Sequence, residues 1–365
     1  MYAFYLPVSC LCTVQNNPRV LSRYIGANGF GRRGLAFATP GKVVWTYATG
    51  GEVDSSVTVY DGVAYFGSYD ANMYAVNAST GAFIRKYPTT GDVESSAVVV
   101  NGTVYFGCDD GYVYAYGTAD GTLRWKVSAG GAIFSTPRVH RGRLYVGAQN
   151  GMTVLDLNSG AVVKTFGEGD VYSTAAFAST SQSVTTGNSL FFGSTAAAIY
   201  AVDLSTGVLR WQTSVNGAVY STVIVNDGVL YAGTFGSMVY ALNATNGAVI
   251  WQTSVGGNIF GAPAFADGML YFGAWDDNLY AVNAKTGNTT WTVSVGDIVD
   301  RSPVVYKGVV YATSGNGVYA VSTSGTIQWT FASPQGGAFY TVPWIYNDMV
   351  LVGSDDNSAY ALSIK

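Results

Sequence analysis

A repeat of about 40 residues is the feature that most restricts how this chain can fold. One glycine marks each period, and successive marker glycines are separated by 40, 40, 39, 47, 40, 40 and 38 residues. The eight markers are Gly41, Gly81, Gly121, Gly160, Gly207, Gly247, Gly287 and Gly325. Four residues after the marker, six periods carry a tryptophan, at Trp45, Trp125, Trp211, Trp251, Trp291 and Trp329. Arg85 and Lys164 fill that place in the other two periods.

Each period contains four short runs with the composition of β-strands. In the first period these runs are 42–47, 55–60, 63–67 and 73–77, and the pair Asp61-Gly62 separates the second run from the third. Asp-Gly pairs accept the positive φ angles of tight hairpins. Four antiparallel strands in each period are the pattern of a propeller blade. The sequence therefore predicts an all-β, eight-bladed β-propeller of four-stranded antiparallel blades.

The two ends of the repeat region predict how the ring closes. The last period ends at Lys365, after only three strand-like runs, whereas the run 42–47 precedes the first complete set of three. We expect residues 42–47 to join the sheet formed by residues 338–364, so that an N-terminal strand completes the last blade. Closure of this kind removes the open ends that a solenoid would have to cap.

The repeats divide the chain into an extension and one domain. Residues 41–365 are expected to form a single propeller, and residues 1–40 a leader or N-terminal extension outside the fold. The extension starts with an uncharged, mostly apolar stretch and continues with four arginines and no acids. A secretory signal, an organellar transit peptide and an extension without a targeting role all remain open. The polar residues 178–188 account for the one long period and are interpreted as a surface loop.

Charge and cysteine content argue against several kinds of partner. Residues 1–40 hold four of the 18 basic residues and none of the 22 acidic ones, which leaves the repeat region with a balance of −8. Nucleic acids require a basic surface, so no nucleic-acid partner is expected. No apolar run reaches the roughly 18 residues of a transmembrane helix, so no transmembrane segment is expected. The three cysteines lack the spacing of a disulfide framework or a zinc site.

The segment from Tyr200 to Trp211 contains the pattern Ala-x-Asp-x-x-x-Gly-x-x-x-Trp, and related segments recur at 115–125, 241–251 and 281–291. This pattern resembles the tryptophan-docking motif of propeller repeats of the pyrroloquinoline quinone (PQQ) type. The resemblance covers residues 41–365 and includes BamB-like and quinoprotein-like propellers. In such repeats the glycine forms a turn and the tryptophan packs between neighbouring blades, which implies a structural docking role for the six tryptophans.

The resemblance leaves more than one function open. The family includes quinoprotein dehydrogenases, which hold PQQ and calcium in the central channel, and also BamB-like assembly scaffolds, sensor domains and secreted proteins without a required cofactor. The dehydrogenases imply an adjacent Cys-Cys pair, which this sequence lacks, and no Cys-x-x-Cys-His haem motif is present. The single histidine, His140, falls at an inner hairpin turn and is interpreted as a turn residue. We therefore expect no catalytic residue, metal or cofactor, with PQQ and calcium only under the dehydrogenase alternative.

Candidate binding residues lie in the loops that lead into the innermost strands, near the central channel. Each loop reads Gly-x-aliphatic-x or close to it. The last position of this pattern is the candidate in each loop, and in the seventh period it falls on Val299. The loop of that period has one extra residue, so Asp300 and Arg301 are the alternatives for this position. With that alternative, the candidates are Asp54, Glu94, Phe134, Tyr172, Tyr220, Phe260, Asp300, Arg301 and Tyr340. One side of this rim is expected to be aromatic and the other acidic, with Glu52 and Asp92 adding charge.

Such a rim suits a cationic ligand, a sugar-like ligand or a peptide strand, although side chains that merely fill the ring are the competing interpretation. The sequence favours a non-catalytic scaffold that binds a protein or a small-molecule ligand at the channel mouth. The alternatives are a PQQ-dependent quinoprotein oxidoreductase, intact or degenerate, and an organellar or envelope assembly factor. A monomeric propeller is expected. Low charge, the extension and sequons at Asn77, Asn101, Asn243 and Asn288 favour an extracytoplasmic or secreted location, with an organelle as the alternative.

Overall fold

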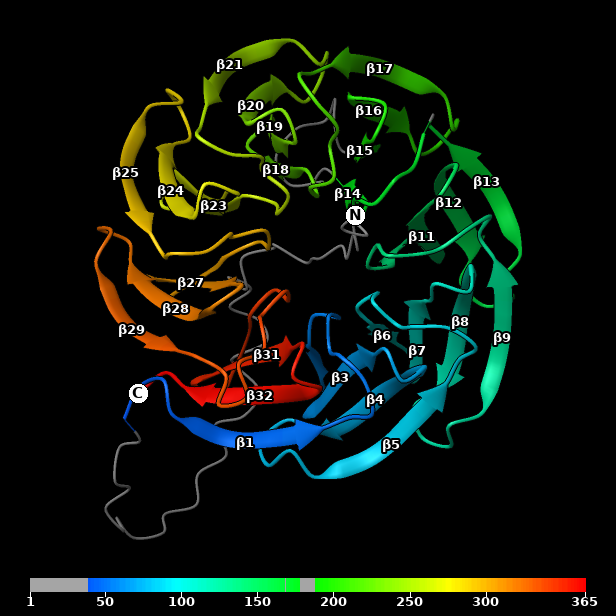
Figure 1. Cartoon of the computed structure of the whole chain (residues 1–365). Helices are drawn as coiled ribbons and strands as arrows, with labels where there is room; N and C mark the ends of the chain where they lie inside the picture. Colours follow the sequence, from blue (N-terminus) through cyan, green and yellow to red (C-terminus); the bar gives the residue numbers. More distant parts are fainter. Residues whose placement is uncertain (1–38, 168, 178–187) are drawn as a thin grey trace, which may run out of the picture.

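The computed structural model describes residues 39–167, 169–177 and 188–365, which form a ring of eight four-stranded antiparallel sheets (Figure 1). Every regular element in this part of the chain is a β-strand. The eight-bladed, all-β propeller predicted from the repeat is confirmed. Nearly all of the proposed leader and residues 178–187 of the polar loop lie outside the described residues. Within the described ranges, no helix is long and apolar enough to cross a membrane.

Each blade begins with a short inner strand and continues outward. The inner strands are β2 (Thr58–Tyr60), β6 (Val98–Val100), β10 (Arg138–His140), β14 (Ala176–Phe177), β18 (Ile224–Asn226), β22 (Ala264–Ala266), β26 (Val304–Tyr306) and β30 (Trp344–Tyr346). The second strands are β3 (Val63–Ser68), β7 (Thr103–Gly107), β11 (Arg143–Ala148), β15 (Ser189–Ser194), β19 (Val229–Thr234), β23 (Met269–Gly273), β27 (Val309–Ser314) and β31 (Met349–Ser354).

The third and outer strands complete the blades. The third strands are β4 (Asn72–Asn77), β8 (Tyr112–Gly117), β12 (Gly151–Asp156), β16 (Ala198–Asp203), β20 (Met238–Asn243), β24 (Asn278–Asn283), β28 (Gly317–Ser322) and β32 (Ser358–Ser363). The outer strands are β5 (Phe83–Pro88), β9 (Leu123–Ser128), β13 (Val162–Phe166), β17 (Leu209–Ser214), β21 (Val249–Ser254), β25 (Thr289–Ser294), β29 (Ile327–Phe331) and β1 (Val43–Ala48).

The N-terminal strand closes the ring as predicted. The last sheet has the order β1-β32-β31-β30, in which Trp45 pairs with Ala361 and Tyr47 with Ala359. Figure 1 shows the blue β1 lying along the red β32. Because the first and last strands of the propeller share one sheet, loss of either strand would open the ring.

The inner strands are shorter than the sequence predicts. The run 55–60 reads as one strand, but β2 begins only at Thr58. The backbone N–H of Ser56 donates to Ser96 Oγ of the next blade at 3.1 Å, and Ser56 Oγ accepts from the N–H of Val342 of the last blade at 2.9 Å. This stretch therefore bonds to the two neighbouring blades instead of to β3, and the ladder starts later.

The apolar core lies between adjacent blades, in clusters that each combine residues of two consecutive sheets. Glycine in the second strand makes this close approach possible. A Cβ on Gly67 would lie 2.2 Å from the carbonyl oxygen of Val93 in the next blade. The same kind of contact occurs at Gly107, Gly147, Gly193, Gly233, Gly273 and Gly353. At these seven places the loop that leads into the next inner strand is thus pressed against the preceding blade, which fixes its position, whereas Thr313 stands at this place in the seventh blade.

Side chains at the tryptophan position also cross the blade boundaries. The indole N–H of Trp45 donates to the carbonyl of Ala78 at 3.1 Å, and a Cβ on Gly81 would lie 2.9 Å from its ring. The two exceptions reach the equivalent turn with cations. Arg85 donates to the carbonyls of residues 119 and 120 at 2.8 and 2.7 Å, and Lys164 Nζ donates to the carbonyl of residue 207 at 2.8 Å.

Candidate functional site

The candidate site is built from two rows of side chains on one end of the ring. The first row consists of the positions predicted from the loops before the inner strands. The second row consists of the first residue in each turn between the second and third strands of a blade. The backbone N–H of a second-row residue donates to a carbonyl in the loop before an inner strand, two residues before the first-row residue of that loop. These bonds are Tyr69 to Glu52 (2.9 Å), Asp109 to Asp92 (3.0 Å), Thr195 to Asp170 (3.0 Å), Phe235 to Ala218 (2.8 Å), Trp275 to Asn258 (3.0 Å), Gly315 to Ile298 (3.4 Å) and Asp355 to Ala338 (3.0 Å). We call the two rows together the rim.

The seventh blade keeps this register with an acid in the first row. The N–H of Val299 donates to the carbonyl of Ala274 at 3.2 Å, just as the N–H of Ile259 donates to the carbonyl of Thr234 at 3.0 Å. Val299 is therefore the buried aliphatic residue of its loop, and Asp300 follows it in the first row. Of the two sequence alignments for this loop, the structure selects the one with Asp300.

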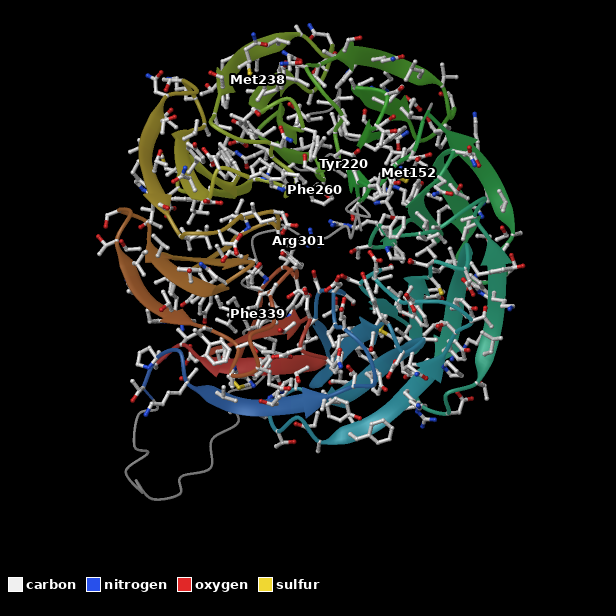
Figure 2. All side chains as sticks on the ribbon, viewed as in Figure 1. Met152, Tyr220, Met238, Phe260, Arg301 and Phe339 are labelled. Carbon is white, nitrogen blue, oxygen red and sulfur yellow. The ribbon has the colours of Figure 1, made fainter. Side chains whose placement is uncertain are left out.

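Four aromatic residues of the first row form a continuous arc. The ring centroids lie 5.4 Å apart between Phe134 and Tyr172, 5.5 Å apart between Tyr172 and Tyr220, and 5.1 Å apart between Tyr220 and Phe260. Figure 2 shows Tyr220 and Phe260 at the inner margin of the ring. Tyr172 and Phe260 are buried, whereas Phe134 and Tyr220 are only partly buried and remain accessible for stacking.

The second row extends this arc with two further aromatic residues. Phe235 packs edge-on against Tyr220 at 5.2 Å and against Trp275 at 4.9 Å. The buried indole nitrogen of Trp275 has no hydrogen-bond partner among the described residues. We call the six rings in blades three to six the aromatic arc.

Arg301 lies at the junction between the aromatic and acidic parts of the rim. Its side chain is 1% exposed, and its guanidinium carbon lies 5.5 Å from the ring centroid of Phe260 and 5.7 Å from that of Tyr340. Nη1 donates to Asp300 Oδ2 at 2.8 Å, and Nε donates to the carbonyl of Tyr340. The rim therefore already holds one cation between a carboxylate and two aromatic faces.

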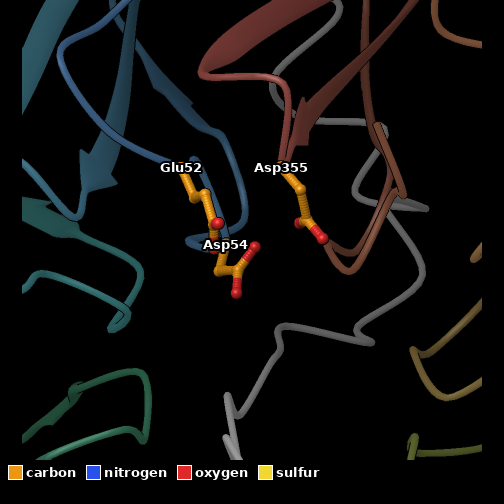
Figure 3. A group of neighbouring side chains, drawn as sticks. All are labelled: Glu52, Asp54 and Asp355. Atoms are coloured by element: carbon orange, nitrogen blue, oxygen red, sulfur yellow. The ribbon is translucent and has the colours of Figure 1, made fainter. Parts of the chain in front are cut away.

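Carboxylates occupy the opposite part of the rim. Tyr69 of the second row donates its hydroxyl to Asp54 at 2.9 Å. Ligand oxygens of Glu52, Asp54 and Asp355 all lie within 4.8 Å of one another, and Figure 3 shows the carboxylates of Asp54 and Asp355 directed toward each other. We call the rim residues Asp54, Glu94, Asp109, Asp300 and Asp355, together with Glu52 of the loop beside them, the acidic arc.

Burial changes the protonation of the acidic arc. Burial, followed by the charge of Asp109, raises the pKa of Glu94 to about 9. Burial and the charge of Asp54 raise the pKa of Asp355 to about 9, and burial with the charge of Asp92 raises that of Asp109 to about 7. Arg301 opposes the first two shifts but does not outweigh them. At neutral pH, part of this arc therefore holds protons, and its negative charge is smaller than the number of carboxylates.

Other sequence candidates lie away from the rim. His140 ends β10, stacks on Phe177 with centroids 4.4 Å apart, and has its pKa lowered mainly by burial. It lies beside the inner hairpin turn, and none of its described contacts involves the rim. The expectation of no metal stays a prediction, although Glu52, Asp54 and Asp355 are close enough together to share one cation.

The second row is not among the candidates that the sequence suggests. Aspartate is common in turns, so Asp109 and Asp355 do not stand out, and the turns that contain Tyr69, Phe235 and Trp275 carry no binding motif. A signal was available, because these positions follow the same period as the first row: Tyr69 and Asp109 are 40 residues apart, as are Phe235 and Trp275. What the sequence could not supply is the backbone hydrogen bond that brings each of these residues beside the first row.

Comparison with known proteins agrees with this architecture. The model of the family described as outer membrane protein assembly factor BamB matches residues 85–226 and 216–329, which is more than half of the chain. The chain belongs to this BamB family. No curated protein matches the sequence at a significant level. The PQQ-like, BamB-like propeller inferred from the repeat is therefore confirmed at the level of the family.

Solved structures show the same fold at low sequence identity. BamB from Moraxella catarrhalis is 16% identical with a TM-score of 0.74, and the match covers 88% of this chain and 99% of that one. Sqt1 from Saccharomyces cerevisiae is 12% identical with a TM-score of 0.77 and coverage of 90% and 100%. The computationally designed Ika8 protein is 14% identical with a TM-score of 0.74 and coverage of 87% and 98%. Identities this low establish the fold alone.

Proposed function

We propose that this BamB-family propeller is a non-catalytic scaffold that binds a partner through the rim. One observation carries the proposal: the backbone of the rim repeats from blade to blade, whereas its side chains do not. A framework that needed only to close the ring could use the same residue in every blade, as it does at the marker glycines. The division into an aromatic and an acidic arc instead gives the rim a polarity that a bound partner can recognise.

Under this proposal the partner that binds the rim is a protein, and the propeller itself acts outside the cytoplasm. The family description as an outer membrane assembly factor supports both points, and an envelope assembly role is the specific form of the proposal. N-terminal sequencing of the mature protein tests the location, because removal of a leader is expected on export. An intact first residue in the mature protein would count against an exported form.

Replacing Tyr220 and Phe260 together by alanine tests the rim. The partner is captured by cross-linking and identified by mass spectrometry, and the alanine pair should no longer capture it. The Tyr220→Leu/Phe260→Leu pair should retain the partner if apolar contact alone is sufficient, and lose it if the aromatic rings are required. The matched control is Leu209→Ala/Val249→Ala, which removes two exposed apolar side chains from outer strands. Thermal melting establishes that each variant is folded. Capture that is unchanged in the folded alanine pair would refute binding at the rim.

The dehydrogenase alternative has a direct test of its own. Protein purified without added cofactor is scanned for quinone absorbance and then assayed for dye reduction after addition of PQQ and calcium. The scaffold proposal expects no dye reduction above that of heat-denatured protein. Turnover that depends on PQQ would overturn the proposal of a non-catalytic protein.

A further inference from the structure

The acidic arc contains buried hydrogen-bond acceptors that lack donors. Asp54 and Glu94 are 7% and 2% exposed, yet Asp54 Oδ1 and Glu94 Oε2 have no hydrogen-bond partner among the described residues. Asp355 Oδ1 is in the same situation. A buried acceptor without a donor destabilises the fold, so a ligand that supplies N–H groups here would recover stability that the free protein lacks.

The convergence of these oxygens suits an ammonium group. An ammonium that donates three hydrogen bonds of about 2.8 Å in tetrahedral directions reaches acceptors up to about 4.6 Å apart, and 4.8 Å is the upper limit of the separations here. The ligand oxygens of Glu52, Asp54 and Asp355 lie within 4.8 Å of one another, and they come from the facing loops of the first and last blades (Figure 3). Asp54, more than nine-tenths buried, points its carboxylate toward this group.

Arg301 shows that the rim can accommodate a cation. Its guanidinium is held by Asp300 and by the faces of Phe260 and Tyr340, all within the two rows. Arg301 lies close enough to lower the pKa values of both Glu94 and Asp355, yet burial and the neighbouring acids still keep both raised. The single internal cation therefore leaves both groups protonated at neutral pH, and an external ammonium that binds here would take the place of the bound protons.

We propose that the rim binds an extended basic segment of a partner protein, with a lysine ammonium among Glu52, Asp54 and Asp355 and neighbouring apolar side chains on the aromatic arc. This inference rests on the proposed function and names the chemistry of the partner. Three carboxylates with water can also satisfy calcium, so calcium is a separate arm of the test below. The aromatic arc adds a surface that a segment of several residues can use and a metal ion cannot.

Fluorescence anisotropy with the full chain tests the proposal. The probe is a fluorescein-labelled short peptide of lysine, phenylalanine and glycine, and its matched control replaces lysine by norleucine, which keeps the length of the side chain and removes the ammonium. We expect the lysine peptide to bind about tenfold more tightly than the norleucine peptide. Equal affinity of the two peptides would overturn the proposal, because the ammonium would then contribute nothing.

Variants identify where the lysine binds. Asp54→Asn and, separately, Asp355→Asn should each weaken the lysine peptide by about tenfold. Asp267→Asn should leave the affinity unchanged. Asp267 is the matched control because it is an exposed acid in the turn after β22, at the other end of the inner strands, where its positive φ of 50° also suits asparagine. If both site variants retain wild-type affinity while their melting curves show them folded, the ammonium is not held by this group.

Two further arms separate the source of the cation. N-acetyl-lysine methylamide and calcium chloride are each titrated alone by calorimetry. Affinity of the free lysine derivative equal to that of the peptide, or displacement of the peptide by calcium at comparable concentration, would overturn recognition of a protein segment. Failure of the peptide to bind, while the Tyr220→Ala/Phe260→Ala pair still loses its cross-linked partner, would reject this inference and leave the proposed function intact. Failure of the peptide to bind, together with unchanged partner capture by the Tyr220→Ala/Phe260→Ala pair, would reject both proposals.

Discussion

Replacement of Glu94 by glutamine should make the protein less sensitive to rising pH. Burial, with a contribution from Asp109, raises the pKa of Glu94 to about 9 in the folded protein, whereas a glutamate in an unfolded chain titrates near pH 4.3. A carboxyl group whose pKa is raised by folding makes its full contribution to stability below the pKa that it has in the unfolded chain. This contribution is lost as the pH rises toward the pKa that it has in the folded protein. Stability of the wild-type chain should therefore fall from about pH 5 to about pH 9.

The magnitude follows from the number of protons held. Where Glu94 is protonated in the folded state and ionised in the unfolded state, the free energy of unfolding changes by about 1.4 kcal/mol per pH unit. Over about three pH units, this one group accounts for up to roughly 4 kcal/mol. Asp109 shares the same surroundings and adjusts its own protonation, so an observed difference of roughly 1–4 kcal/mol agrees with the structure.

Urea unfolding, followed by tryptophan fluorescence at several pH values, measures the effect. Near pH 5, Glu94→Gln and the wild type should have similar stability, because glutamine resembles the protonated acid in shape and in its ability to donate. Near pH 8 the variant should be the more stable of the two. Asp267→Asn, which removes an exposed acid, should follow the wild-type curve. Parallel pH dependence of Glu94→Gln and the wild type would refute the raised pKa and the electrostatic picture of the acidic arc.

Three further predictions concern the framework. Trp45→Ala should reduce the free energy of unfolding by about 3–5 kcal/mol, because the side chain is 6% exposed and bonds to the next blade; a melting temperature within error of the wild type would contradict this. Deletion of residues 41–48 removes β1 and should abolish the single cooperative transition in calorimetry, whereas a truncated chain that melts like the intact one would show that closure does not depend on this strand. Gly67→Ala should destabilise the protein by about 1–3 kcal/mol or more in urea, since its Cβ would meet the carbonyl oxygen of Val93; unchanged stability would mean that the blades can separate at little cost.

The blades and the ring closure could be predicted from the sequence because their causes are local and repeated. Marker glycines adopt positive φ, 71° at Gly81 and 73° at Gly247, and turns of this kind are set by residue type. The starts of the inner strands could not be predicted. Whether residues 55–57 join the ladder depends on bonds from Ser56 to Ser96 and Val342, which lie in other blades.

The first row of the rim was also accessible from the sequence, down to the division between aromatic and acidic residues. The protonation and the charge contacts of these residues could not be predicted from the sequence. Burial raises the pKa of Asp355 and the charge of Asp54 adds to the shift, and these two residues belong to different blades that meet only when the ring closes. The position of Arg301 between two aromatic rings likewise depends on the extra residue in its loop, whose placement the alignment left open.

The second row provides an argument that the polarity of the rim belongs to a site. Turn chemistry alone would favour aspartate or asparagine at every second-row position, yet Phe235 and Trp275 stand there in the aromatic blades. Packing alone would favour apolar residues throughout, yet Asp109 accompanies Glu94 in the acidic part. The two rows share their character in the second, fifth and sixth blades, but not in the first, where Tyr69 accompanies Asp54, or in the fourth, where Thr195 accompanies Tyr172. The agreement is therefore confined to Glu94 with Asp109 in the acidic part and to the aromatic pairs of the fifth and sixth blades. A ligand that contacts both rows at these places accounts for this agreement, whereas side chains that only fill space would not need to agree.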